Sequence, residues 1–450
     1  MKLKNGRSLL SCIAYLGIGM LGATGSPSTV HAVNLGVDFN LTAKPAAGGM
    51  AGAAYTTPRE VTAAIFGNPA TLTLFDQNET SMGSTFMGLS LDVCQDGMAG
   101  VNCSQSATDS LLAPDIGMAM PVSSNLVLGI GIEIDAGLGA EYRTDPISLF
   151  GGSGATAVTI PLTAQLMSFN TNFALGYEVN QRWSLGIAAT VGYAQAHLGT
   201  VGPTQNLALL GFDDFGGTTS PAQDIALSGS LGAVYRSPQG LAVSAVLKLP
   251  MKYTFEDAVY YDIGPSSQGF QALPLSVPAE VIVGVASDGG LISNTLVEMD
   301  LIWKGYGSAA TLEDVWKDQW VLSLGFEHRA PESKWAWRGG AIYMSDLFRT
   351  TFPNTLGGLG GLGSIPLGEN DVGIGSDFVK LAQVTILPSA SKYTLTGGFG
   401  YRLSPGLELN LNGQWSFDAS LVSNVGSFGT QYTADGQIWQ IGIGLSMKLR

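Results

Sequence analysis

The chain has 450 residues, of which 45% are hydrophobic and only 12% are charged, and its formal net charge is −14 at pH 7. An average soluble domain carries about 25% charged residues, so these values favour a membrane protein. No apolar run of about 18 residues, the length that a spanning helix needs, follows residue 32. Because only helices and closed barrels satisfy their backbone groups in lipid, a transmembrane β-barrel remains. The negative charge also argues against nucleic acid as a partner.

The first 32 residues have the layout of a secretory signal. Basic residues without any acid precede the apolar stretch Leu9–Gly22, and a polar segment then ends at Ala32. This order predicts export and cleavage after Ala32. The run Leu9-Leu10-Ser11-Cys12 also fits a lipoprotein signal, but most of the apolar stretch follows Cys12, so cleavage there would leave too short an apolar region.

The next stretch, residues 33–78, alternates poorly and is rich in alanine and glycine. It is either a disordered tail or a plug inside the barrel, and its closely spaced apolar side chains favour packing over disorder. These side chains are Ile65, Phe66, Leu72, Leu74 and Phe75. The predicted parts are therefore a signal peptide (1–32), an N-terminal hatch or plug (33–78) and a transmembrane β-barrel (79–450).

Period-two alternation runs through the rest of the chain and is clearest at its end. From Trp439 to Arg450, apolar residues occupy the odd positions, and glycine or polar residues occupy the even positions. Only an extended chain separates two such sets onto opposite faces. The same criterion predicts about fourteen strands, an even number as in bacterial single-chain barrels. They span residues 79–92, 113–122, 125–142, 166–179, 182–197, 223–237, 240–256, 274–287, 292–306, 319–330, 333–345, 391–404, 406–421 and 437–450.

The connections between these strands alternate in length. Short turns such as Ser123-Ser124 and Asn180-Gln181 follow the even strands, and long segments follow the odd strands. Outer-membrane barrels have short periplasmic turns and long external loops, so both termini are expected in the periplasm. The long segments include 143–165, 198–222, 257–273 and 346–390.

Two cysteines, Cys94 and Cys103, lie close together in a polar, glycine-containing segment. Export exposes them to an oxidising compartment. No histidine lies near them in the sequence that could form a nucleophilic pair or a metal site with them. The spacing therefore predicts a loop disulfide between them.

Several charged residues fall on the strand face opposite the lipid-facing side chains. A charge facing lipid near the midplane costs about 2–4 kcal/mol for Arg or Lys, which enforces this placement. We expect these residues to form a solvated and paired lining of the lumen. Arg338 or Lys248 is also a candidate to receive a substrate carboxylate. The full set is Lys248, Glu298, Asp300, Glu327 and Arg338.

Enzymatic function receives little support. By parity, His328 belongs to the outward face near the periplasmic rim, whereas His197 lies near the external end of its strand with Asp213 and Asp214 in the loop that follows. No nucleophile motif accompanies this pair, and metal ligands at a familiar spacing are missing from the sequence. We therefore predict no catalysis, no metal and no cofactor.

The segment Phe66–Asp76, which contains Asn68-Pro69-Ala70, resembles the end of the N-terminal hatch in the long-chain fatty acid transporter family of outer membranes (FadL and TodX-like). Further segments are similar to that family's strands in the same order along the chain. Leu128–Tyr142 resembles its third strand, Phe173–Gly186 its fourth and fifth, and Trp337–Tyr343 its eleventh.

The resemblance implies a barrel of about fourteen strands, plugged by a hatch, with capture of fatty acids or hydrocarbons at external loops. It further implies a lumenal apolar pocket and a lateral opening at a kink in the third strand, where Gly137 and Gly139 lie. Glycine tolerates such a break, but glycine that merely eases barrel curvature is an equal alternative. The loops after strands five and seven look short for the family and 346–390 looks long, so the capture surface is expected to have moved.

The sequence thus predicts an all-β transmembrane barrel in the outer membrane that takes up hydrophobic small molecules passively. Its expected partners are a hydrophobic ligand and outer-membrane lipid, and the chain is expected to be a monomer. The alternatives are a structural or adhesive barrel that binds a surface partner, and a diffusion porin.

Overall fold

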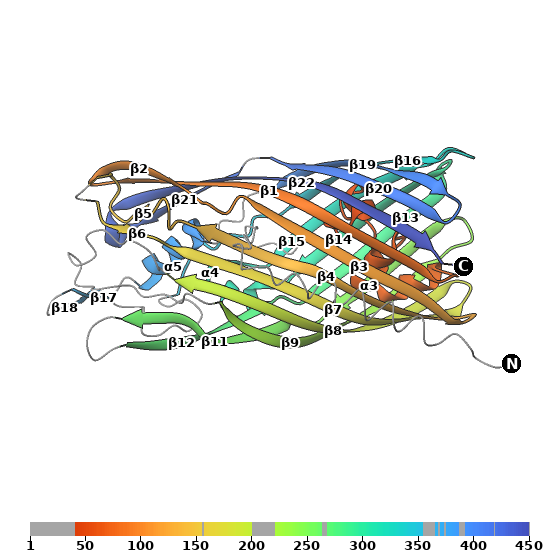
Figure 1. Cartoon of the computed structure of the whole chain (residues 1–450), viewed down its shortest axis with the longest axis horizontal. Helices are drawn as coiled ribbons and strands as arrows, with labels where there is room; N and C mark the ends of the chain where they lie inside the picture. The colour runs from red at the N-terminus through yellow and green to blue at the C-terminus, as the bar shows by residue number, and fades with distance from the viewer. Residues whose placement is uncertain are drawn as a thin grey trace. The chain divides into compact units, whose positions relative to one another are not determined.

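The structure is a computed structural model that describes residues 41–154, 157–199, 221–262, 268–353, 365–367, 370–372, 375–386, 392–417 and 419–449. Long antiparallel strands dominate it (Figure 1). The predicted signal peptide and its cleavage site lie outside the described residues. The strands of the wall are β1 (Glu79–Gly97), β3 (Ser110–Ser123), β4 (Leu126–Glu141), β7 (Thr163–Asn180), β8 (Trp183–Gly199), β9 (Ala222–Arg236), β10 (Leu241–Lys248), β13 (Glu280–Ile292), β14 (Thr295–Lys304), β15 (Gln319–His328), β16 (Trp335–Met344), β19 (Tyr393–Ser404), β20 (Leu407–Ser416) and β22 (Thr430–Lys448).

The wall closes because β1 pairs with β3 on one side and with β22 on the other. The closing register runs from Glu79↔Lys448 to Asp96↔Gln431. Two further strands, β2 (Gly100–Gln105) and β21 (Ala419–Val425), extend the sheet beside β1 and β22. The prediction of a closed barrel with fourteen antiparallel strands is therefore confirmed.

Alternation of side chains places the apolar face of the wall outward. On β15, Trp320, Leu322, Leu324 and Phe326 are exposed, and the residues between them are buried. In a membrane barrel the outward positions meet lipid, so an exposed apolar side chain there is stabilised rather than penalised. The predicted orientation of these strands is confirmed.

Prolines shift one boundary in each of two predicted wall strands. The predicted strand 240–256 stops at Lys248, before Pro250, and the predicted strand 274–287 begins only at Glu280, after Pro278. Proline has no backbone N–H to donate to a ladder, so the wall pairing breaks at both positions. The chain between them forms a separate hairpin of β11 (Met251–Asp262) and β12 (Gln268–Val277).

Short elements occupy the end of the barrel where the long connections lie, which the loop asymmetry identifies as the external end. In Figure 1, α4 and α5 lie at the same end of the barrel as β2, β5 and β6. No helix in the described ranges is long and apolar enough to cross a bilayer. The elements are β5 (Ile147–Ser148), β6 (Thr159–Ile160), η3 (Tyr306–Ser308), α4 (Leu312–Val315), β17 (Ile365–Leu367), β18 (Asn370–Val372), α5 (Gly375–Thr385) and η4 (Gly426–Phe428).

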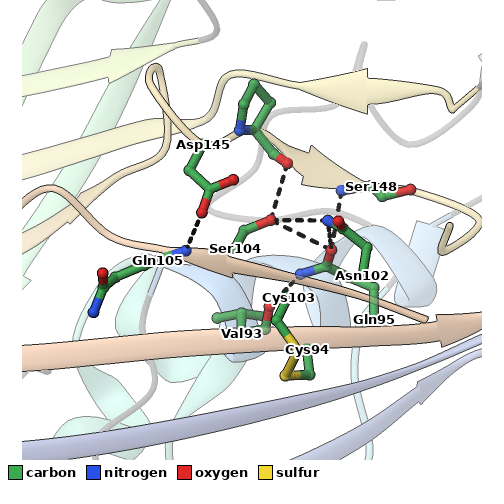
Figure 2. The surroundings of a disulfide bond; sticks show 10 residues. Val93, Cys94, Gln95, Asn102, Cys103, Ser104, Gln105, Asp145 and Ser148 are labelled. Carbon is green, nitrogen blue, oxygen red and sulfur yellow. Dashed lines mark hydrogen bonds between the residues drawn. A yellow bond between two sulfur atoms is a disulfide. The ribbon is translucent and has the colours of Figure 1, made fainter. Parts of the chain in front are cut away.

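Cys94 on β1 and Cys103 on β2 form the predicted disulfide, which is confirmed (Figure 2). The hairpin is also tied to the connection after β4, because the backbone N–H of Gln105 donates to Asp145 Oδ2 at 2.8 Å. These links fasten the β1–β2 hairpin to the connection that follows β4.

The residues before β1 fold into short helices inside the wall. They are α2 (Pro45–Gly48), α3 (Val61–Phe66) and η1 (Pro69–Leu74), and nearly all of residues 41–72 are buried. These helices contact β1, β3, β4, β7, β8, β9, β19, β20 and β22. In Figure 1 this red-to-orange region lies toward the end of the barrel that carries the C-terminus. We call residues 41–76 the N-terminal segment.

Candidate functional site

The motif Asn68-Pro69-Ala70 packs against glycines of two neighbouring strands, β8 and β9. Asn68 Nδ2 donates to the Tyr55 carbonyl at 2.8 Å, and Asn68 Oδ1 accepts from the Ala70 N–H at 3.1 Å. A Cβ atom on Gly186 would lie 2.1 Å from the Ala70 nitrogen, and one on Gly232 would lie 2.0 Å from Asn68 Oδ1. Only glycine lets the backbone approach this closely.

Two buried carboxylates of β14 bind the backbone of the N-terminal segment. Glu298 accepts from the N–H groups of Thr56 at 2.7 Å and Thr57 at 3.0 Å, and Asp300 accepts from Tyr55 at 3.5 Å. The predicted inward direction is confirmed. The expectation of a solvated lining is wrong for both residues, which are 0% exposed because the segment covers them.

A third carboxylate closes the N-terminal segment on itself. Glu60 Oε1 accepts from the N–H groups of Ala46 and Ala47, each at 2.9 Å. These amides belong to the first turn of α2, where backbone N–H groups have no partner within the helix. The segment is therefore held together, as well as to the wall, by hydrogen bonds that need one geometry.

Arg338 is at the centre of an ion-pair network on the same side of the barrel. Its Nε donates to Glu327 at 2.7 Å, its Nη1 donates to Asn410 at 2.7 Å, and its Nη2 donates to Glu408 at 3.3 Å. Glu327 also pairs with Arg59 of the N-terminal segment at 3.1 Å. A ligand carboxylate could bind Arg338 only by displacing these partners. The role of Arg338 in ligand binding stays a prediction.

Lys248, the other candidate, is the last residue of β10. It shares Glu280 with Lys304, with N–O distances of 3.2 Å and 3.0 Å. The Lys248 side chain is 24% exposed whereas that of Lys304 is 0% exposed, and its ammonium lies 5.9 Å from the Tyr55 ring centroid. Of the two predicted cations, Lys248 is the more exposed, because the Arg338 side chain is only 1% exposed.

The wall parts between β3 and β4, the second and third strands of the barrel. Their ladder ends at Asp115↔Glu133, while β4 continues to pair with β7 up to Glu141↔Thr163. The two edges meet again where the Ala107 N–H donates to the Glu141 carbonyl at 2.8 Å. A stretch of wall between these two points lacks the β3–β4 ladder, although both strands are described throughout.

An extra residue in β4 lies next to this interruption. The register with β7 shifts between Ile134 and Ala136, so Asp135 is the additional residue of a bulge. Gly137 and Gly139, which the sequence analysis selected, pair regularly with β7 two and four residues further along. The glycines predicted the kink, whereas the bulge is at Asp135; the two acids Glu133 and Asp135 in mid-strand are the sequence signal for it.

Helix α5 fills the external end between two apolar clusters. Val379 and Ala382 belong to a cluster with Tyr253 and Trp316, whereas Leu381 and Val384 belong to one with Tyr142 and Tyr432. The Tyr142 hydroxyl donates to the Thr385 carbonyl at 3.1 Å. The long 346–390 connection therefore supplies a helix whose two sides join opposite parts of the barrel mouth.

Two cavities lie at opposite ends. One of about 720 Å³ lies beside the N-terminal segment, and its lining combines Arg59, Arg329 and Arg402 with Leu74 and Phe75. The other, of about 460 Å³, lies between the chain that follows β16, helix α5 and strand β21. Each is within the range of about 300–1,000 Å³ that small-molecule sites occupy.

The two histidines weighed for catalysis lie far apart in the barrel order. His197 is near the external end of β8, and Asp213 and Asp214 lie outside the described residues. His328 ends β15 with its Nδ1 2.9 Å from Thr295 Oγ1. Among the described residues, no group of three or more His, Cys, Asp or Glu side chains is placed to hold a metal ion.

Comparisons with known proteins agree on one family. The family model described as outer membrane protein transport protein (OMPP1/FadL/TodX) matches residues 38–296. A long-chain fatty acid transport protein of Escherichia coli O6:H1 is 23% identical over 150 residues, which cover 32% of this chain and 31% of that protein. The chain therefore aligns with about a third of the length of this curated relative.

Solved structures show the same fold. A Pseudomonas aeruginosa FadL homologue has a TM-score of 0.64 at 11% identity, covering 94% of this chain and all of the other. The toluene transporter TodX of Pseudomonas putida has a TM-score of 0.62 at 14% identity, with 90% and 98% covered. The toluene transporter TbuX of Ralstonia pickettii has a TM-score of 0.58 at 16% identity, with 92% and 100% covered.

Proposed function

Because this outer-membrane barrel belongs to the outer membrane protein transport protein family (OMPP1/FadL/TodX), we propose that it takes up hydrophobic small molecules without an energy source. The names of its relatives point to long-chain fatty acids and to monoaromatic hydrocarbons such as toluene. A family of transport proteins also supports the prediction of a non-enzymatic role.

The proposed route has three parts. A molecule is captured in the apolar external end, passes into the lumen near Lys248, and leaves sideways between β3 and β4 into the membrane. The N-terminal segment acts as the hatch: it fills the periplasmic side of the lumen with hydrogen-bonded backbone, which offers an apolar molecule no favourable path. That filling also argues against a diffusion porin, which needs an open lumen.

The observation that carries the proposal is the end of the β3–β4 ladder at Asp115↔Glu133, next to the bulge at Asp135. Unpaired strand edges facing lipid are costly, because lipid offers no hydrogen-bond partner. The interruption beside this bulge is explained if it serves as an exit. Gly137 and Gly139 then belong to the rim of this opening rather than to its kink.

Deletion of Asp135 tests the exit directly. Because Ile134 and Ala136 already face Phe169 and Ser168 on β7, removing the extra residue restores a regular ladder and keeps the register. We expect the deletion to reduce uptake of radiolabelled dodecanoate or toluene by about tenfold or more, since a flattened strand closes the gap. Asp135→Ala is the matched control, because it removes the carboxylate and leaves the bulge.

Uptake is measured in cells whose own transporters of this kind are deleted, with equal barrel levels confirmed in the outer membrane. Full uptake by the deletion variant would overturn the lateral exit and leave transport intact. Equal loss in both variants would assign the effect to the carboxylate. No uptake of either probe by the unaltered chain would overturn the proposed function.

A further inference from the structure

The cavity of about 720 Å³ beside the N-terminal segment has more basic than acidic residues in its lining, unlike the chain as a whole. Among the described residues, five basic and four acidic side chains line it, whereas the chain carries 21 basic and 35 acidic residues. Arg329 follows the end of β15, Arg402 lies near the end of β19, and Lys448 is the last residue of β22. The fold therefore gathers at the periplasmic end cations that lie far apart in the sequence.

One carboxylate in this cavity serves three arginines. Arg329 Nη2 donates to both oxygens of Glu408, at 2.7 and 2.8 Å. Arg338 Nη2 donates to the same side chain at 3.3 Å, and Arg402 Nε lies 3.5 Å from it. A guanidinium carries about five N–H donors, whereas a carboxylate has about four acceptor positions. Glu408 therefore cannot satisfy the three arginines alone.

Three cations of the lining have donors to spare. Arg329 Nη1 is buried and has no hydrogen-bond partner among the residues that the structure describes. The Arg402 side chain is 51% exposed, and Lys448 Nζ lies 3.9 Å from its acid, Glu79. A buried donor without an acceptor is destabilising, so an added acceptor here is favourable. A further anion can bind these cations while Glu408 keeps its own pairs.

We propose that this cavity binds a phosphate group, whose oxygens accept from Arg329 Nη1, Arg402 and Lys448. The three side chains come from three different elements, and the tetrahedral oxygens of a phosphate can meet donors from several directions. A carboxylate presents its oxygens in one plane and suits a single guanidinium fork better. The site goes beyond the proposed function, because no step of the proposed uptake route passes through it.

Two sources offer this phosphate chemistry, namely soluble phosphate in the periplasm and the headgroup of an inner-leaflet lipid. The lining of the cavity favours the lipid. Leu407 lines it together with Glu408, and alternation along β20 places Leu407 on the face that meets lipid. The cavity therefore lies at the rim of the wall, where lipid headgroups are in reach.

A bound phosphate would also strengthen the attachment of the N-terminal segment. Arg59 of that segment lines the same cavity and pairs with Asp288 and Glu327, each at 3.1 Å. An added negative charge attracts Arg59 toward the rim. We expect hydrogen exchange at the Arg59 amide to slow when phosphate is added, and unchanged exchange would contradict this added attachment.

Titration of the purified full chain with inorganic phosphate in a non-ionic detergent tests the site, with acetate as the comparison anion. We expect phosphate to bind about tenfold tighter than acetate, because it offers acceptors to more of these cations. Added NaCl should weaken phosphate binding, since salt screens partly exposed charges.

Variants assign the binding to the cavity. Arg402→Gln should weaken phosphate binding about tenfold, because it removes a charged hydrogen bond. Glu408 keeps Arg329 and Arg338 in this variant, so the rim should stay folded. Arg182→Gln is the matched control, because Arg182 is an exposed arginine in the turn between β7 and β8 and does not line the cavity.

Native mass spectrometry after extraction from membranes distinguishes the two sources. For a lipid headgroup, phosphatidylglycerol should stay bound to the natural chain and to Arg182→Gln but not to Arg402→Gln. Phosphate binding without any retained lipid would assign the cavity to soluble phosphate. The inference is overturned by the absence of both phosphate binding and retained lipid, by acetate binding as tightly as phosphate, or by equal effects of Arg402→Gln and Arg182→Gln.

Discussion

The two ends of this barrel are closed by different chemistry. At the periplasmic side, carboxylates such as Glu298 and Glu60 bind backbone N–H groups of the N-terminal segment, and arginines pair with acids around them. At the external end, α5 packs between two apolar clusters, and one hydrogen bond to each is described, from Tyr142 to the Thr385 carbonyl and from Gln383 to the Val315 carbonyl.

This difference matters for an apolar ligand. Apolar packing is non-directional, so a hydrocarbon chain can replace side-chain contacts at little cost. A buried N–H or carboxylate that loses its partner costs about 1–3 kcal/mol, and an apolar ligand cannot replace that partner. The external end is therefore exchangeable with ligand, whereas the N-terminal segment resists displacement. Both features fit the proposed route of entry from outside and lateral release.

Gly186→Ala should have the largest effect, because its side chain would occupy the space in which the N-terminal segment packs against β8. The added Cβ would lie 2.1 Å from the Ala70 nitrogen, so backbone must move. Ordinary overpacking already costs about 1–3 kcal/mol. We expect the segment to unseat and the ion conductance of the reconstituted barrel to rise.

Gly413→Ala is the control for that variant, since its Cβ would lie 4.0 Å from the nearest neighbouring atom, the Gln440 carbonyl oxygen. Unchanged conductance in Gly186→Ala would mean that the segment does not block the lumen.

Glu298→Ala should loosen the same segment without a clash. It leaves the N–H groups of Thr56 and Thr57 without an acceptor, which costs about 1–3 kcal/mol of stability for each buried group. Hydrogen exchange at these two amides should accelerate, while exchange in the wall stays slow. Glu298→Gln should have a smaller effect, because its amide oxygen still accepts from one of the two N–H groups, which bind different oxygens of Glu298. Equal protection in all three proteins would contradict the binding role of the carboxylate.

Val379→Ala tests the external end by the same measurement. Val379 is 0% exposed, and losing its two methyl groups removes about 1–2 kcal/mol of burial. We expect faster exchange in α5 and no change in the N-terminal segment. Faster exchange in both α5 and the N-terminal segment would show that the two ends of the barrel are coupled.

The smallest expected effect is the pH dependence of α5. Partial burial raises the pKa of Asp377, but hydrogen bonds from Lys380 and Ser427 outweigh it, so the pKa lies below its ordinary value. Its contribution is therefore complete above about pH 4 and is lost as the pH falls through the lowered value. Proteolysis of α5 should increase below that point in the natural chain, and Asp377→Asn should remove this dependence. A pH response that persists in the variant would assign it to another group.

The sequence by itself determined the wall. Alternation from Glu79 onward has only one physical meaning in a chain this poor in charge, because lipid demands a paired backbone and an apolar outer face. It therefore predicted the closed barrel and the inward direction of Glu298 and Asp300. The close spacing of Cys94 and Cys103 in an exported chain separately predicted the disulfide.

Tertiary structure alone decided what those inward groups contact. Alternation gives the face of a side chain but not its partner, so Glu298 was expected to meet water and instead binds Thr56 and Thr57 of a segment more than two hundred residues away. The bulge at Asp135 and the position of α5 escaped prediction for the same reason. Each depends on which strands or clusters become neighbours when the sheet closes, and local sequence carries no record of that.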